Sequence, residues 1–234
     1  MSALVREPVE IAVVDYGMGN RRSVEKALEH VGASVLVSGD REPLSAAAGL
    51  VVPGVGAFPR AMDKLREQGL DELLIERVRA GTPVLGICLG MQLAFERSSE
   101  LGGADGLGIV RGEVRALEAG DLKLPHIGWN EVCLTGPAAA ASGPGSRLIA
   151  DLPERCAFYH VHSFAPVPAE AQDVLGTAEY GAPFVTAVQH GSFYGVQFHP
   201  EKSSAAGLRL LANFARICIA APAPAPADLS SAAH

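Results

Sequence analysis

The sequence lacks the positive charge, the paired cysteines and the long apolar runs that mark several large classes of protein. Its 234 residues carry a formal net charge of −7 at pH 7, so no surface for nucleic acid or for an anionic membrane is expected. No secretory signal and no stretch long enough to span a bilayer is visible, which predicts a cytoplasmic protein. The cysteines form neither a CxxC pair nor a zinc pattern and favour a reducing compartment: Cys88, Cys133, Cys156 and Cys218.

What is present fits one globular domain. Hydrophobic residues make up 48% of the chain and charged residues 19%, which excludes general disorder. We expect a single domain over residues 1–219 without internal repeats, and a surface loop at 135–146. Residues 220–234 alternate alanine with proline and then turn polar, so a disordered tail is predicted there.

The order of apolar runs and amphipathic stretches predicts an α/β fold. Strands are expected at 11–14, 34–38, 50–52 and 84–87, with helices at 23–30 (capped by Ser23), 60–68 and 71–80. Strands that alternate with helices imply a parallel sheet with right-handed crossovers. From about residue 102 short runs punctuated by glycine predict antiparallel strands that cover the sheet edge, at 108–110, 112–115, 131–134, 156–164, 184–189 and 193–198. A final amphipathic helix is expected at 205–219.

Cys88 lies on the predicted turn between the strand at 84–87 and a helix expected at 89–97. Gly86 and Gly90 flank it, two residues away on each side, as in a cysteine version of the Gly-x-Ser-x-Gly nucleophile elbow. A thiol at a helix N-terminus faces unpaired N–H groups and the positive end of the dipole, which favours its thiolate. The alternative is an inert buried thiol, as most cysteines are.

A cysteine nucleophile needs a base and a group that orients the base. His199 is the best candidate base, because a hydrophobic strand ends at it and Pro200 stops the ladder. Strand carboxyl ends share the functional edge of a parallel sheet, where Cys88 is also expected. Glu201 can then turn back to the other ring nitrogen. The alternative is a surface His-Pro-Glu turn.

Acyl transfer also requires N–H donors for the oxyanion. The N–H of Leu89 follows the nucleophile directly and is one expected donor. The segment Pro-Gly-Val-Gly-Ala-Phe at 53–58 follows the third strand, and its flexible backbone is the expected source of a second donor. A simple strand-to-helix turn is the alternative for this segment.

Together these motifs resemble those of the class I, or triad, glutamine amidotransferases. The resemblance is carried by Gly-Ile-Cys-Leu-Gly-Met-Gln at 86–92 and His-Pro-Glu at 199–201. More narrowly, blocks at 15–20 (Asp-Tyr-Gly-Met-Gly-Asn), 53–56, 125–130 (Pro-His-Ile-Gly-Trp-Asn), 159–163 (Tyr-His-Val-His-Ser) and 199–203 (His-Pro-Glu-Lys-Ser) resemble the glutaminase subunits of imidazole glycerol phosphate synthase, in histidine biosynthesis. The similarity extends from about residue 11 to residue 215, apart from the Ala/Gly-rich loop.

The resemblance implies a fold and a reaction. The fold is α/β, a three-layer sandwich around a mainly parallel sheet with antiparallel additions and a flavodoxin-like core. In the implied reaction Cys88 attacks the side-chain amide of L-glutamine and releases ammonia, while His199 moves protons and Glu201 orients His199. Gln92 and the backbone around His162 and Ser163 would hold the substrate, and the N–H groups at Val55, Gly56 and Leu89 would form the oxyanion hole.

The resemblance also implies a partner. Ammonia would pass to a (β/α)8-barrel cyclase subunit, which makes imidazole glycerol phosphate and aminoimidazole carboxamide ribotide. Trp129 and Lys202 would lie near the partner interface and the ammonia exit, and no cofactor or metal is implied. The chain departs from the family pattern at Arg21 and Arg22, where one apolar residue is expected first, and in its Ala/Pro tail.

Several alternatives stay open at this point. Within the same chemistry, the chain could serve another class I amidotransferase or act alone as a γ-glutamyl hydrolase. A catalytically inactive regulatory subunit is a third possibility, although the intact triad argues against it. The glycines at 17–19 evoke a dinucleotide loop, but Arg22 replaces the third glycine. His160 and His162 share a strand face as a metal pair would, yet no third ligand is near in sequence.

Overall fold

The N-terminal half of the chain alternates strands with helices. The computed structural model describes residues 10–135 and 147–221. Its first elements are β1 (Glu10–Val14), α1 (Arg21–His30), β2 (Ser34–Ser38), α2 (Arg41–Ala46), β3 (Gly49–Gly54), α3 (Phe58–Glu67), α4 (Leu70–Arg79), β4 (Val84–Cys88) and α5 (Leu89–Gln92). The predicted alternation is confirmed here, and α2 is an element that the sequence analysis missed.

The second half is mostly strand. Its elements are β5 (Phe95–Ser98), η1 (Glu100–Gly102), β6 (Ala104–Asp105), β7 (Val110–Ala116), β8 (His126–Cys133), β9 (Arg155–His162), β10 (Phe164–Pro168), η3 (Ala171–Asp173), β11 (Val174–Tyr180), β12 (Ala182–His190), β13 (Phe193–Val196), η4 (Pro200–Lys202) and α7 (Ser204–Ala220). The strand predicted at 156–164 corresponds to β9, and β10 and β11 were not predicted.

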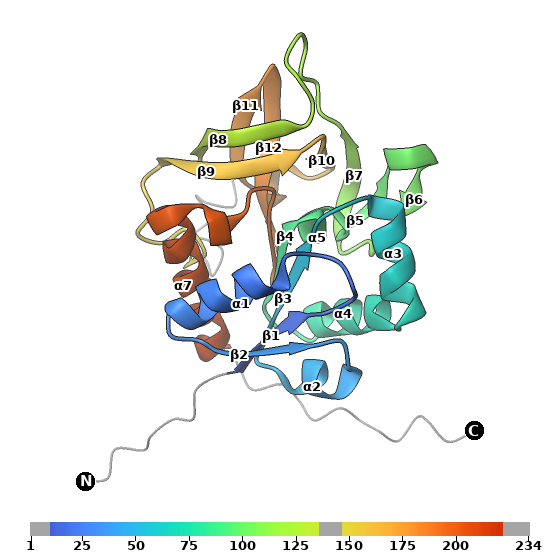
Figure 1. Cartoon of the computed structure of the whole chain (residues 1–234), viewed down its shortest axis with the longest axis vertical. Helices are drawn as coiled ribbons and strands as arrows, with labels where there is room; N and C mark the ends of the chain where they lie inside the picture. Colours follow the sequence, from blue (N-terminus) through green and yellow to red (C-terminus); the bar gives the residue numbers. More distant parts are fainter. Residues whose placement is uncertain (1–9, 136–146, 222–234) are drawn as a thin grey trace.

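A nine-stranded sheet forms the centre of the molecule (Figure 1). Its order is β2-β1-β3-β4-β13-β12-β11-β8-β9, in which the first five strands are parallel and the rest antiparallel. Alternate residues of β1 point to opposite faces: Ile11 and Val13 join a core with α1 and α7, whereas Ala12 and Val14 join a core with α3 and α4. Both faces are thus covered by helices, which confirms the expected three-layer sandwich.

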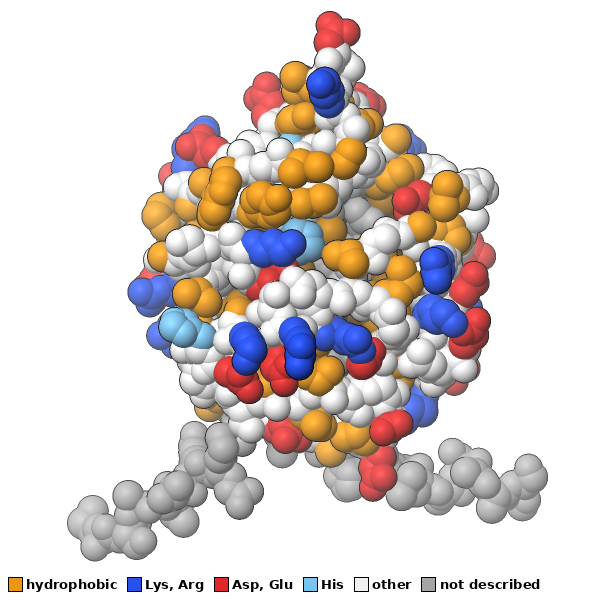
Figure 2. Space-filling model, viewed as in Figure 1, with side chains coloured by type: hydrophobic (Ala, Val, Ile, Leu, Met, Phe, Trp, Pro, Cys, Tyr) orange, Lys and Arg blue, Asp and Glu red, His pale blue; other side chains and the backbone are white. Residues whose placement is uncertain are grey.

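Apolar side chains are exposed along β8. Because strand residues alternate between faces, Ile127 and Trp129 point outward while His126 is buried on the opposite face. Leu122 and Leu124, just before the strand, are exposed as well. Figure 2 shows hydrophobic side chains gathered in a band over β8 and β9.

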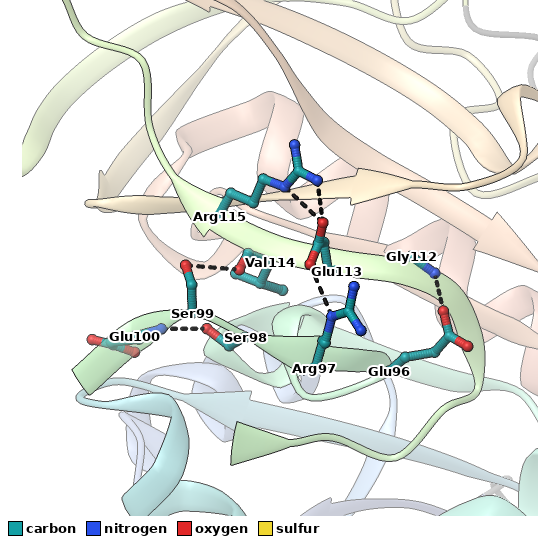
Figure 3. Close-up of polar contacts among 9 residues, drawn as sticks. All are labelled: Glu96, Arg97, Ser98, Ser99, Glu100, Gly112, Glu113, Val114 and Arg115. Atoms are coloured by element: carbon teal, nitrogen blue, oxygen red, sulfur yellow. Dashed lines mark hydrogen bonds and ion pairs between the residues drawn. The ribbon is translucent and has the colours of Figure 1, made fainter. Parts of the chain in front are cut away.

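A second, four-stranded sheet has the order β10-β7-β5-β6. Strand β7 pairs antiparallel with β10, as expected for this part of the chain, and in parallel with β5, which was not predicted as a strand. Polar side chains link these two strands (Figure 3): Glu113 of β7 accepts hydrogen bonds from Arg97 of β5 at 2.9 Å and from Arg115. The Glu96 carboxylate accepts from the N–H of Gly112 at 2.7 Å. This sheet carries β10, which follows β9 directly.

The helix predicted at 89–97 is the main error of the sequence analysis. Only α5 is helical, and the chain continues as β5 from Phe95. The carbonyls that a longer helix would use are taken by another segment: Leu93 O accepts from Leu107 N at 2.8 Å, and Ala94 O accepts from Ile109 N at 2.8 Å. Tertiary hydrogen bonds therefore replace the helical ones.

Other expectations were corrected or stay untested. Helix α1 begins at Arg21 rather than after Ser23, and Arg21 pairs with the Asp15 carboxylate. The loop predicted at 135–146 and the tail predicted at 220–234 lie almost wholly outside the described residues. Within residues 10–135 and 147–221, no helix is long and apolar enough to cross a membrane.

The packing of α5 on β3 generates a stability prediction. A Cβ at Gly90 would lie 1.8 Å from the carbonyl oxygen of Val52, a backbone atom that cannot move alone. We expect Gly90→Ala to lower the free energy of unfolding by about 3 kcal/mol or more, measured by urea unfolding. Gly191→Ala is the control, because that glycine has φ +57° with open space around it. Its expected cost is about 1 kcal/mol, and an equal loss in both variants would contradict the argument.

Candidate active site

A cavity of about 250 Å³ opens where β3 and β4 end side by side. In parallel sheets the carboxyl ends of the strands are the usual place for a site. Gly54, the last residue of β3, pairs with Cys88, the last of β4. The cavity is lined by Val55, Gly56, Cys88, Leu89, Gln92, Glu100, Pro125, Val161, His162, Ser163, Phe164, His199 and Lys202.

Cys88 lies on a strained turn. Its φ of 54° and ψ of −110° are unusual for a residue with a side chain, and they place it between β4 and α5 as the glycine spacing predicts. A Cβ at Gly86 would lie 2.6 Å from the carbonyl oxygen of Gly90, so both flanking glycines are sterically required. The turn holds a reactive side chain at the N-terminus of α5, at the edge of the cavity.

The thiol has two polar neighbours that sequence reasoning missed. The Gln197 amide nitrogen donates to Cys88 Sγ at 3.6 Å, and Sγ lies 3.7 Å from the carbonyl oxygen of Val161. Gln197 is fully buried. Its position could have been found from the period of two in Val-Gln-Phe-His, which points Gln197 and His199 to the same side.

His199 lines the same cavity as Cys88, and Glu201 lies behind it. Nδ1 of His199 is 2.9 Å from Oε1 of Glu201, and both side chains are almost completely buried. Burial alone would lower the pKa of His199, but hydrogen bonds and charge interactions with Cys88 and Glu201 outweigh it and raise the pKa to about 9. His199 is therefore protonated at neutral pH. The strand before it ends at Val196, two residues earlier than the predicted end at 198.

Ser203 holds the backbone of His199 in place. Its hydroxyl donates to His199 O at 2.6 Å and accepts from the N–H of Tyr159 at 2.9 Å. The N–H of His199 in turn donates to Tyr159 O at 2.8 Å. No local pattern indicates this role, because a serine before a helix is usually a cap.

The segment at 53–56 is held at its start and exposed at its end. The hydroxyl of Tyr16, a buried residue, donates to Pro53 O at 2.9 Å. Val55 is 44% exposed, and Gly56 has φ +105°, a conformation that favours glycine. Both residues face the cavity together with Leu89.

The three predicted substrate residues also line the cavity: Gln92, His162 and Ser163. The Gln92 amide nitrogen donates to Phe164 O at 3.0 Å and to Gln197 Oε1 at 3.0 Å. This ties Gln92 to the wall of the cavity.

Lys202 and Trp129, which the resemblance places near the same interface, differ in their relation to the cavity. Lys202 lines the cavity, and its ammonium lies 5.8 Å from the centre of the Tyr159 ring. Trp129 lies outside the cavity lining and is 56% exposed, with its ring centre 6.2 Å from that of Tyr159. Tyr159 is thus between the two and was not singled out from the sequence.

His160, the second half of the possible metal pair, is bonded to protein groups. Its Nε2 lies 2.8 Å from the Thr186 hydroxyl and its Nδ1 lies 3.1 Å from Phe158 O. In the part of the chain that the structure describes, no group of three or more His, Cys, Asp or Glu side chains is arranged to hold a metal ion.

Comparisons with known proteins identify the family of this chain. The model of the family "Glutamine amidotransferase class-I" matches residues 12–218. The chain belongs to the class I glutamine amidotransferases. Among curated relatives, it is 47% identical over 207 residues to "Imidazole glycerol phosphate synthase subunit HisH" of Moorella thermoacetica, covering 88% of this chain and 94% of the relative. The subunit of the same name from Bacillus cereus is 46% identical over 205 residues, covering 87% and 93%.

Solved structures share the fold at lower identity. PurLQS from Thermotoga maritima superposes with a TM-score of 0.67 at 17% identity, covering 91% of this chain and 98% of that chain. A glutamine amidotransferase from the same organism gives 0.58 at 17% identity, covering 84% and 77%.

The raised pKa of His199 generates a pH prediction. Since the folded value of about 9 lies above the ordinary 6.5, the resulting stabilisation is complete below pH 6.5 and is lost as the pH rises through about 9. We expect the stability advantage of the wild type over His199→Gln to shrink by about 2 kcal/mol between pH 7 and pH 9. Urea unfolding at a series of pH values measures it. A constant difference over that range would contradict a protonated His199.

Proposed function

We propose that this chain is the glutaminase subunit of an imidazole glycerol phosphate synthase in the cytoplasm, with Cys88, His199 and Glu201 as its catalytic residues. The observation that carries the proposal is the shared cavity of Cys88 and His199, with the Glu201 carboxylate 2.9 Å behind the imidazole. The two residues are 111 positions apart in sequence, and the arrangement is that of nucleophile, base and orienting acid.

The reaction hydrolyses L-glutamine in two steps. The Cys88 thiolate attacks the side-chain carbonyl carbon and forms a C–S bond. Protonated His199 then gives its proton to the leaving nitrogen, the C–N bond breaks, and ammonia departs from a γ-glutamyl thioester. Neutral His199 next takes a proton from water, which attacks the thioester. Glutamate leaves, and the thiolate and the protonated imidazole are both restored. Glu201 stabilises the imidazolium at Nδ1.

The tetrahedral intermediates carry a negative oxygen that needs N–H donors. We assign this role to the N–H of Leu89 and to a peptide N–H at Val55 or Gly56, which face the cavity with Cys88. The positive φ of Gly56 and the exposure of Val55 suit a peptide that can reorient. The substrate would be held by Gln92 and by the segment at His162 and Ser163.

In the proposed function, a partner protein must receive the ammonia. The HisH relatives are named as subunits of imidazole glycerol phosphate synthase, so the partner proposed here is the (β/α)8-barrel cyclase subunit. The exposed band over β8 and β9, which includes Ile127 and Trp129, is the face proposed for docking. The proposed role of Lys202 near the ammonia exit is supported by its position in the cavity lining and by its ammonium, which lies 5.8 Å from the centre of the Tyr159 ring.

Replacement of the nucleophile tests the proposal directly. In a complex with the cyclase subunit, we expect Cys88→Ala to abolish glutamine-dependent synthesis, by at least about a thousandfold, because no thioester can form. Ammonium-dependent synthesis should remain, since the cyclase site is intact. Both rates are measured from formation of imidazole glycerol phosphate.

Cys218→Ala is the matched control, because that thiol lies in α7 against Gly49 at the start of β3, outside both the cavity lining and the proposed docking face, and should leave both rates unchanged. Loss of both rates in a Cys88→Ala complex that still assembles would contradict the proposal. Absence of a Cys88 adduct after treatment with a glutamine-analogue electrophile, mapped by mass spectrometry, would instead indicate an inactive subunit.

A further inference from the structure

Three buried histidines lie together next to the cavity: His126 on β8, and His160 and His162 on β9. Only His162 lines the cavity. His126 and His162 are direct partners in the β8–β9 register, and Nδ1 of His126 is 3.1 Å from Nε2 of His162. The mechanism proposed above leaves both rings without a proton-transfer role.

The neighbouring groups determine the direction of these hydrogen bonds. Nδ1 of His162 is 2.9 Å from Phe164 O, and a carbonyl oxygen only accepts, so the proton of neutral His162 is on Nδ1. Its Nε2 must then accept the hydrogen bond from Nδ1 of His126. At the other side of His126, Nε2 is 3.4 Å from the Asn130 amide, which also donates to Glu179 O at 2.9 Å.

Burial keeps both imidazoles neutral at neutral pH, and so keeps the directions of these hydrogen bonds. Burial is the main cause that lowers the pKa of His162 to about 4, and burial also lowers the pKa of His126. Neutral imidazoles have one donor and one acceptor, so a run of them has a direction. The ring of His126 is further fixed by stacking on Tyr180, at 4.0 Å between ring centres and 23° between planes.

We propose that His126 is a positioning residue for the glutamine pocket: its Nδ1–H holds His162 in one tautomer and one orientation, and thereby holds the cavity wall at 161–164. This inference rests on the proposed function for its kinetic consequence. The wall matters because Phe164 O accepts hydrogen bonds from both His162 and Gln92, which joins the histidine chain to the helix that begins after Cys88.

The hydrogen bonds among His162, His126 and Asn130 lie on the inner side of the β8–β9 pair, beneath the exposed band over these strands. His126 and Asn130 point inward from β8, while Ile127 and Trp129 between them point outward. Any shift of β8 against β9 would therefore change the contact between the two rings.

Two variants at one position separate the hydrogen bond from the ring. The amide nitrogen of asparagine is attached at the γ position, as Nδ1 is, so His126→Asn can still donate to His162. The amide of glutamine is at the ε position, so in His126→Gln it faces Asn130 and leaves Nε2 of His162 without this donor. In the complex with the cyclase subunit, we expect His126→Gln to raise the KM for glutamine about tenfold with kcat within about twofold. His126→Asn should raise KM by less than about threefold.

Thr186→Val is the matched control. It removes the hydroxyl 2.8 Å from Nε2 of His160, a hydrogen bond to a histidine of the same buried cluster that does not lead to the cavity. It should lower Tm but leave KM unchanged. If His126→Gln and His126→Asn raise KM equally, or if Thr186→Val raises it as much, His126 acts through general packing and the inference is overturned.

A second measurement does not depend on turnover. Nitrogen-15 NMR of the wild-type complex at pH 7 should show His162 protonated at Nδ1 and unprotonated at Nε2, with the signals changed in His126→Gln. A proton on Nε2 of His162 would overturn the inference even if the enzyme is active. A wild-type complex that does not hydrolyse glutamine, yet shows the expected tautomer, would overturn the proposed function and leave the hydrogen-bond chain standing.

Discussion

The site depends on how closely the turn after β4 packs against the end of β3. Gly90 approaches the Val52 carbonyl so closely that no side chain fits, and a Cβ at Gly54 would lie 2.8 Å from the Cβ of Leu89. This contact accompanies the positive φ of Cys88, a buried residue whose side chain lines the cavity. Strain of this kind costs roughly 1–3 kcal/mol and persists only where the surrounding packing enforces it. The position of the thiol at the cavity edge is thus a consequence of core packing.

Four histidines lie near this turn, and the groups that each one contacts decide whether it is charged or neutral. All are buried, which disfavours the charged form. His199 alone contacts a carboxylate and the thiol, and these raise its pKa to about 9. His160 and His162 contact carbonyls, a hydroxyl and another imidazole, so burial prevails and their pKa values fall to about 3 and about 4.

Strand β9 joins the two halves of the fold at the site. The nucleophile comes from the parallel half, yet the Val161 carbonyl lies 3.7 Å from its sulfur. Strand β9 also forms two hydrogen-bonded links to the His199 backbone. His199 N donates to Tyr159 O, and the Ser203 hydroxyl links Tyr159 N to His199 O. The antiparallel strands therefore do more than cover a sheet edge. They contact both the Cys88 side chain and the His199 backbone.

Local pattern was enough for the first strands and helices, for the turn at Cys88 and for the pairing of His199 with Glu201, because spacing and glycine placement are local properties. It failed at β5, where the carbonyls of Leu93 and Ala94 bond to a segment more than a dozen residues away. It also missed Gln197, Ser203, Tyr16 and His126, since buried polar residues gain their roles from partners distant in sequence. The sequence by itself determined which chemical groups the protein carries and which of them stand on turns. Only tertiary structure decided which groups meet and which histidine keeps its proton, because burial and hydrogen bonding are properties of the packed chain.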